Sequence, residues 1–221
     1  PPYTNETEAE APIVADDEKP VVTAEKPRIA IILDDGGYGG SDTEAVWKLP
    51  TQLTLSILPN TPHGGETAQK AIAAGFEVML HMPMETDNRK VNPVKGQLTR
   101  IMDKETIAQL TREALAQVPG AKGVNNHTGA FFTADKERMT WFMEVVKEAG
   151  VYFVDSRTTP KSEGYNVAKA LGVPTINRDV FLDNDNEPAK IRIQLDELVA
   201  KALKKNQAVA IGHFRKNTIR S

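Results

Sequence analysis

The chain of 221 residues is 40% hydrophobic and 26% charged, a composition typical of a folded protein of one or two domains. Its formal net charge is −3, and it contains no dense basic block interleaved with aromatic residues, which excludes the usual pattern of a nucleic-acid-binding protein. The absence of cysteine excludes disulfides, thiolate zinc ligands and cysteine nucleophiles. The apolar runs are far shorter than the roughly 20 residues needed to cross a bilayer, so we expect no membrane-spanning helix.

Residues 1–27 differ in composition from the rest of the chain. They hold seven acidic residues against two lysines, together with five prolines and no hydrophobic period. A segment of this kind buries too little apolar surface to offset the entropy lost on ordering. We interpret residues 1–27 as a flexible acidic, proline-rich linker and residues 28–221 as the folded domain.

From residue 28 onward, short β-branched runs alternate with longer amphipathic stretches, which indicates a parallel α/β sheet or barrel. The sequence predicts seven strands, at residues 29–33, 53–58, 77–81, 123–126, 152–155, 174–177 and 208–212. It predicts six helices, at residues 41–48, 67–74, 104–117, 136–149, 162–171 and 189–204. Asp135 and Gly150 flank the fourth helix and match the residue types that begin and end helices.

Polar residues with catalytic potential follow several of the predicted strands. Asp34 and Asp35 follow the first strand, His81 ends the third, His127 follows the fourth, and His213 follows the last. In parallel α/β folds the carboxyl ends of the strands open on one face, where functional side chains gather. We therefore expect these side chains to lie close together.

A divalent metal binds carboxylate oxygen and neutral imidazole nitrogen, and one Asp with two His leaves positions open for water and substrate. This chemistry predicts a metal site formed by Asp35, His81 and His127. Neighbouring residues of a strand point in different directions, so Asp34 is free for another role, and we interpret it as a general base. A simple tight turn at residues 34–37 is the alternative.

For the remaining candidate residues the sequence leaves more than one role open. His213 is a candidate for proton transfer, and a buried structural histidine is its alternative. His63 is surrounded by turn-forming residues and is expected in a loop. Asp155 and Arg157 form either a pair that tunes a catalytic group or a pair that holds a loop. The charged residues after the sixth strand fit structural roles slightly better than catalytic ones: Arg178, Asp179 and Asp183.

Six sequence blocks resemble, in the same order, the signatures of the divergent polysaccharide deacetylase family. They lie at residues 31–39, 80–85, 123–129, 153–158, 178–184 and 211–213. The resemblance implies a distorted seven-stranded (β/α) barrel of the polysaccharide deacetylase type. It also implies removal of N- or O-acetyl groups with a bound divalent metal, commonly zinc.

The resemblance also implies roles for individual residues. In the wider superfamily the first acid of an Asp-Asp motif is the base and the second is a metal ligand, which corresponds to Asp34 and Asp35 here. His81 corresponds to the ligand after the third strand, and His213 corresponds to the catalytic histidine after the last strand.

The third-strand motif departs from that of better-known deacetylases, which carry two histidines one helical turn apart. Here His81 is followed by Met84 and Glu85. The second nitrogen ligand is therefore expected from His127.

The expected function is a metal-dependent hydrolase that removes acetyl groups from a cell-envelope polysaccharide or oligosaccharide. Family resemblance implies a bacterial periplasmic or envelope location, with a signal or anchor before this chain and a terminal helix after it. An alternative is an envelope module of weak or no activity that binds glycan or a protein partner. Hydrolysis of another bond, such as a phosphoester, is disfavoured because the sequence shows no basic phosphate clamp.

Overall fold

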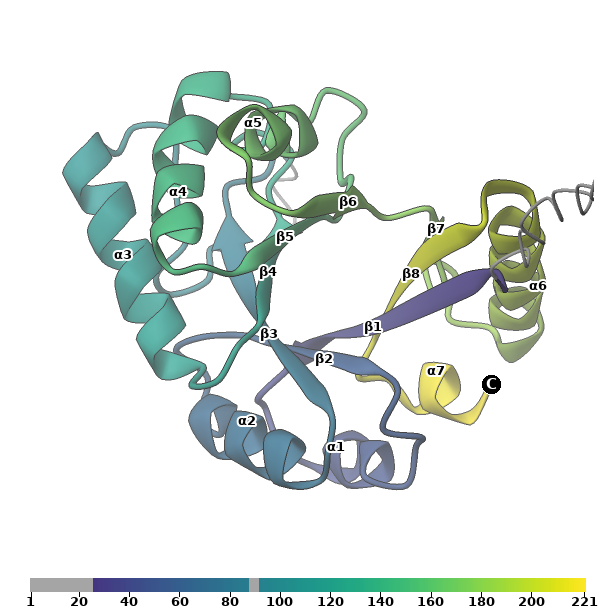
Figure 1. The fold of residues 1–221 in the computed structure, drawn as a ribbon. Helices are drawn as coiled ribbons and strands as arrows, with labels where there is room; N and C mark the ends of the chain where they lie inside the picture. Colours follow the sequence, from purple (N-terminus) through teal and green to yellow (C-terminus); the bar gives the residue numbers. More distant parts are fainter. Residues whose placement is uncertain (1–25, 88–91) are drawn as a thin grey trace, which may run out of the picture.

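The computed structural model describes residues 26–87 and 92–221, and within these ranges eight parallel strands form one sheet (Figure 1). The sheet order is β6-β5-β4-β3-β2-β1-β8-β7, and the sheet curls into an open barrel. The strands are β1 (Arg28–Gly36), β2 (Thr54–Ile57), β3 (Glu77–Met84), β4 (Gly123–Thr128), β5 (Tyr152–Asp155), β6 (Thr175–Asn177), β7 (Val180–Phe181) and β8 (Gln207–His213). The seven predicted strands are all present. The eighth, β7, has two residues, too few to produce a recognisable pattern.

Helices cover the outside of the barrel (Figure 1). They are α1 (Ser41–Val46), α2 (Gly64–Ala73), α3 (Lys104–Gln117), α4 (Lys136–Glu148), α5 (Gly164–Leu171), α6 (Pro188–Lys205) and α7 (Lys216–Arg220). The six predicted helices are confirmed, and α7 was not predicted. Among the described helices, none is both long and apolar enough to span a bilayer. The predicted linker, residues 1–27, lies almost wholly outside the described ranges.

The barrel is distorted because its edge strands, β6 and β7, do not pair with each other. Two residues, Arg178 and Asp179, carry the chain from one edge to the other. The Arg178 N–H donates to the Asp155 carbonyl at 2.9 Å, and the Asp179 N–H donates to the Val209 carbonyl at 2.8 Å. The seam is therefore bridged by the chain itself rather than by a strand ladder.

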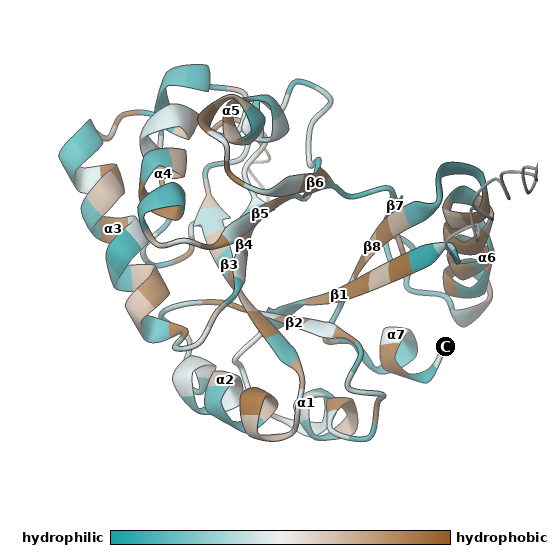
Figure 2. Ribbon diagram, viewed as in Figure 1, coloured by the Kyte–Doolittle hydropathy of each residue, from teal (hydrophilic) through white to brown (hydrophobic). Residues whose placement is uncertain are grey.

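Apolar side chains occupy both faces of the sheet, and the helices carry hydrophobic residues on one side and hydrophilic residues on the other (Figure 2). A small cluster of buried residues fills the barrel interior: Ile32, Met79, Val154, Val209 and Ile211. Side chains two residues apart share one face of a strand. The residues two positions further along β1, β3 and β8 are therefore directed to the same interior: Asp34, His81 and His213.

We predict that Asp135→Ala lowers the free energy of unfolding by about 1 kcal/mol, because the Asp135 carboxylate accepts a hydrogen bond from the Arg138 N–H at the start of α4. Asp135→Asn is the matched control, since an asparagine amide oxygen caps a helix comparably. Urea denaturation of the three proteins measures the difference. Equal losses in both variants would contradict a capping role.

Candidate active site

A bulge in β1 places two neighbouring carboxylates on one side of the strand. Asp35 adopts a left-handed backbone conformation, with φ of 67°, and the pairing of β1 with β2 shifts register between Leu33 and Gly36. The Asp34 Oδ2 and Asp35 Oδ1 atoms consequently lie 3.5 and 3.3 Å from the same atom, His81 Nε2. The sequence predicted that the side chains of Asp34 and Asp35 point in different directions. That prediction was wrong, because the bulge interrupts the alternation of side chains between the two faces of β1.

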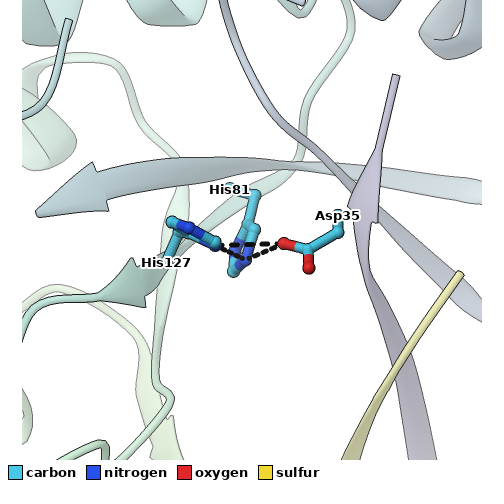
Figure 3. A group of neighbouring side chains, drawn as sticks. All are labelled: Asp35, His81 and His127. Carbon is cyan, nitrogen blue, oxygen red and sulfur yellow. Dashed lines mark hydrogen bonds and ion pairs between the residues drawn. The ribbon is translucent and has the colours of Figure 1, made fainter. Parts of the chain in front are cut away.

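The three predicted metal ligands meet at one point, with Asp35 from β1, His81 from β3 and His127 from β4 (Figure 3). The Asp35 Oδ1 atom lies 3.3 Å from His81 Nε2 and 3.0 Å from His127 Nδ1. The two imidazole nitrogens are 3.1 Å apart. Ligand atoms around a tetrahedral zinc ion are about 3.3 Å apart, so the triangle has the size that such an ion requires.

The donor atoms also have the chemistry that a metal requires. Asp35 Oδ1 is buried and accepts no well-aligned hydrogen bond from the described residues, although it faces two imidazole nitrogens. His81 Nδ1 lies 2.7 Å from the Asn125 amide oxygen. Because that oxygen can only accept, Nδ1 carries a proton, so in the neutral imidazole Nε2 has the lone pair that a metal would bind. The three side chains therefore fit a divalent metal such as zinc.

Local electrostatics separate the two neighbouring carboxylates. Burial is the largest effect on Asp34, and it raises the pKa of this carboxyl above its usual value. Burial also opposes ionisation of Asp35, but the imidazoles of His127 and His81 that face its carboxylate lower the pKa of Asp35 well below its usual range. Asp35 thus remains ionised as a ligand, whereas Asp34 has the higher proton affinity that suits a base.

Asn125 connects the metal ligands to Asp34, a role that the sequence did not reveal. This fully buried residue donates from Nδ2 to Asp34 Oδ1 at 2.8 Å. Its amide oxygen faces His81 Nδ1 at 2.7 Å and accepts from the Ser56 hydroxyl at 2.7 Å. One side chain therefore orients a ligand and the candidate base together. The signal available in the sequence was its position two residues before His127, on the same face of β4.

His213 faces the cluster from β8 and is oriented by a buried carboxylate. Its Nδ1 atom lies 2.8 Å from Asp183 Oδ1, and its Nε2 atom lies 3.9 Å from Asp35 Oδ2. Burial opposes ionisation of Asp183, but the hydrogen bond to His213 lowers the pKa of Asp183. The other Asp183 oxygen accepts from the His213 N–H at 2.9 Å and from the Thr218 hydroxyl of α7 at 2.6 Å. Asp183 thus fixes the ring that the sequence marked for proton transfer.

Asp155 and Arg157 hold a loop rather than join the cluster. The Asp155 carboxylate accepts hydrogen bonds from the Arg157 N–H at 2.8 Å, the Ser162 hydroxyl at 2.7 Å and the Tyr165 N–H at 3.1 Å. The Arg157 guanidinium donates to the Ser162 and Pro160 carbonyls, both at 3.3 Å. The catalytic role predicted for Asp155 does not fit this position, because the inward residue of β5 is its neighbour, Val154. Arg157 does line the cavity, as a loop anchor.

The cluster opens into a cavity of about 470 Å³ at the carboxyl end of the barrel. Its wall includes Asp34, His81 and His127 on the metal side, and His213 on the opposite side, nearer the seam. Arg178 and Phe181 line the seam side. The Arg178 Nε donates to the Ser156 carbonyl at 2.6 Å, and its guanidinium lies over the Phe181 ring. His63 lies outside this cavity, half-exposed beside Glu66, as predicted.

Together, the fold and the site define an open (β/α) barrel with a candidate metal centre at its mouth. The chain belongs to the divergent polysaccharide deacetylase family, whose model matches residues 31–221. The family inferred from the six sequence blocks is thereby confirmed.

Two relatives and one solved structure extend the comparison. An uncharacterized protein of Haemophilus influenzae is 35% identical over 195 residues, which are 87% of this chain and 68% of that protein. The uncharacterized protein YibQ of Escherichia coli is 34% identical over 194 residues, 87% of this chain and 60% of its own length. The crystal structure of an uncharacterized Agrobacterium tumefaciens protein has 24% identity and a TM-score of 0.85, covering 91% of this chain and 82% of its own. That likeness supports the fold.

We predict that His81→Ala and His127→Ala each reduce bound zinc to well under half of the wild-type amount, because each removes one of three converging donors. His63→Ala is the matched control, since this histidine lies outside the cluster. Elemental analysis after dialysis against a defined zinc buffer gives the stoichiometry. Undiminished zinc in both cluster variants would contradict the ligand assignment.

Asn125→Ala should weaken zinc binding by about 10- to 100-fold, because His81 loses the acceptor that fixes its ring. The neighbouring Asn126 is also buried, but its amide bonds the Thr128 carbonyl and the Ser156 N–H. Asn126→Ala therefore controls for loss of a buried amide and should retain near-wild-type zinc affinity. Competition with a chromogenic chelator measures the zinc affinity of the wild-type protein and both variants. Equal affinities would contradict a role of Asn125 in metal binding.

Proposed function

We propose that this protein is a metal-dependent hydrolase that removes acetyl groups from a polysaccharide of the bacterial cell envelope. The observation that carries the proposal is the position of Asp34. Its carboxylate lies 3.5 Å from a ligand atom of His81 but is separate from the three converging donors. A site built only to hold a metal has no need of a second, buried carboxylate with raised pKa beside it. Family membership supports acetyl groups as the target.

The residues divide the chemistry of hydrolysis between two sides of the cavity. A divalent cation held by Asp35, His81 and His127 would polarise the acetyl carbonyl and acidify water. Asp34 then accepts the proton from the attacking water. His213, held by Asp183, donates a proton to the departing amine or hydroxyl. Because both groups are fixed by hydrogen bonds before substrate arrives, little reorganisation is required.

The proposal includes the cell envelope, with the periplasm as the compartment. Its support is the family match and the polysaccharide substrates that the family name describes. The competing possibility is an envelope module that binds glycan or a protein partner without turnover. The two possibilities differ in whether Asp34 is needed for chemistry.

Asp34→Asn should lower acetate release by about 10²- to 10⁴-fold while zinc remains bound, because the amide keeps the size of the side chain but cannot accept the proton. The exposed Asp196 of α6 provides the control variant Asp196→Asn, with unchanged activity expected. Enzymatic detection of acetate from a panel of N- and O-acetylated glycans measures turnover, and elemental analysis measures zinc. Glycan binding without acetate release by the wild-type protein would favour the binding module. Undiminished acetate release by the Asp34→Asn variant would mean that another residue is the general base.

A further inference from the structure

A second hollow adjoins the metal-site cavity. Its volume is about 430 Å³, and it shares Asp87 and Ala130 with the cavity that contains the metal cluster. Residues from three separate segments complete it, including Arg100, Phe131 and Lys161. The second hollow therefore lies beside the cavity that contains the candidate metal centre and shares part of its lining.

An aromatic ring is exposed in this second hollow. Phe131 lies in the turn after β4 with 37% of its surface exposed, and the Arg100 guanidinium stacks 4.1 Å from its ring centroid. The Phe131 N–H donates to the Glu85 carbonyl at 3.1 Å, just beyond β3. The ring is therefore anchored to the ends of β3 and β4, the strands that carry His81 and His127. Its position relative to the metal cluster is fixed by the barrel.

The hollow is lined by charges of both signs, Asp87 and Asp135 against Arg100 and Lys161. Glu85 accepts from the Arg100 N–H at 2.7 Å and from its Nε at 3.4 Å. Asp135 caps α4 and pairs with Arg138 at 3.4 Å. Because two acidic and two basic side chains surround an exposed aromatic ring, the hollow favours a ligand that is neutral, with an apolar face and hydroxyl groups at its rim. A pyranose ring has these properties.

We propose that this hollow, defined by Arg100, Phe131, Thr159 and Lys161, is a subsite for a second sugar ring of the substrate. The proposal rests on the proposed deacetylase function and deepens it, because it assigns named residues to the binding of a sugar ring next to the one that is deacetylated. In this proposal, the sugar ring that stacks on Phe131 and the sugar that lies at the candidate metal site belong to the same glycan chain. The Phe181 ring of the metal-site cavity contacts both Arg178 and His213, whereas the Phe131 ring contacts Arg100 and keeps 37% of its surface exposed, which makes it the better platform.

The test compares sugar chains of different length. The probes are β-1,4-linked N-acetylglucosamine oligomers of one to five units, titrated calorimetrically into the zinc-loaded protein and assayed in parallel for acetate release. We expect the pentamer to bind at least 10-fold more tightly than the monomer. Phe131→Ala should remove most of this gain and leave monomer affinity unchanged, whereas Phe131→Tyr should preserve it. Leu203→Ala, at an exposed apolar residue of α6, controls for loss of surface hydrophobicity.

The outcomes separate the subsite from the activity. Chain-length-dependent binding that requires Phe131, without acetate release, would support the subsite and overturn the deacetylase. Acetate release without any dependence on chain length or Phe131 would retain the deacetylase and overturn the subsite. Failure of every oligomer to bind would also overturn the subsite, as would an equal loss of monomer and pentamer affinity in Phe131→Ala.

Discussion

The left-handed backbone at Asp35 is the constraint on which the site depends. A regular strand would direct Asp34 into the barrel and Asp35 toward the surrounding helices. The φ of 67° at Asp35 reverses this and brings both carboxylates to one imidazole. Aspartate tolerates this region better than most residues, but the conformation still carries strain. The glycine that follows gives room to its neighbours, because a Cβ on Gly36 would lie 2.5 Å from Ile57 Cδ1 and 3.0 Å from Phe214 Cζ and would force these side chains to move.

The strained turn is stabilised by polar groups buried in the barrel. Asp34, His81 and Asn125 are all almost inaccessible to solvent, so each charge or dipole must find its partner inside the protein. Asn125 meets this requirement for both Asp34 and His81 through opposite ends of one amide. The same hydrogen bonds that satisfy the buried groups also determine which nitrogen of His81 faces the cluster. Stability and ligand geometry therefore depend on the same contacts.

The sequence predicted the cluster because strand ends in a parallel sheet share one face, so His81 and His127 had to meet. It predicted the long strands from their apolar runs and missed β7 and α7, which are too short to show a period. Missing β7 also concealed the proximity of Asp183 to His213. For Asp155 the sequence left a catalytic and a loop-holding role open because the inward face of β5 was unknown, and Val154 occupies that face. The β1 bulge is a register shift, which no local pattern reveals.

The two sides of the cavity are built differently, and this has a consequence for function. On the metal side, the candidate ligands and Asn125 belong to β1, β3 and β4, which the sheet joins through β2. On the other side, His213 is held by Asp183, which follows a strand of only two residues, and by Thr218 on α7. In the proposed hydrolysis the metal ligands would need a fixed spacing, which their places within the sheet supply. The proposed proton donor, His213, would instead stand beside the open seam, where its partners come from the end of a two-residue strand and from a short helix.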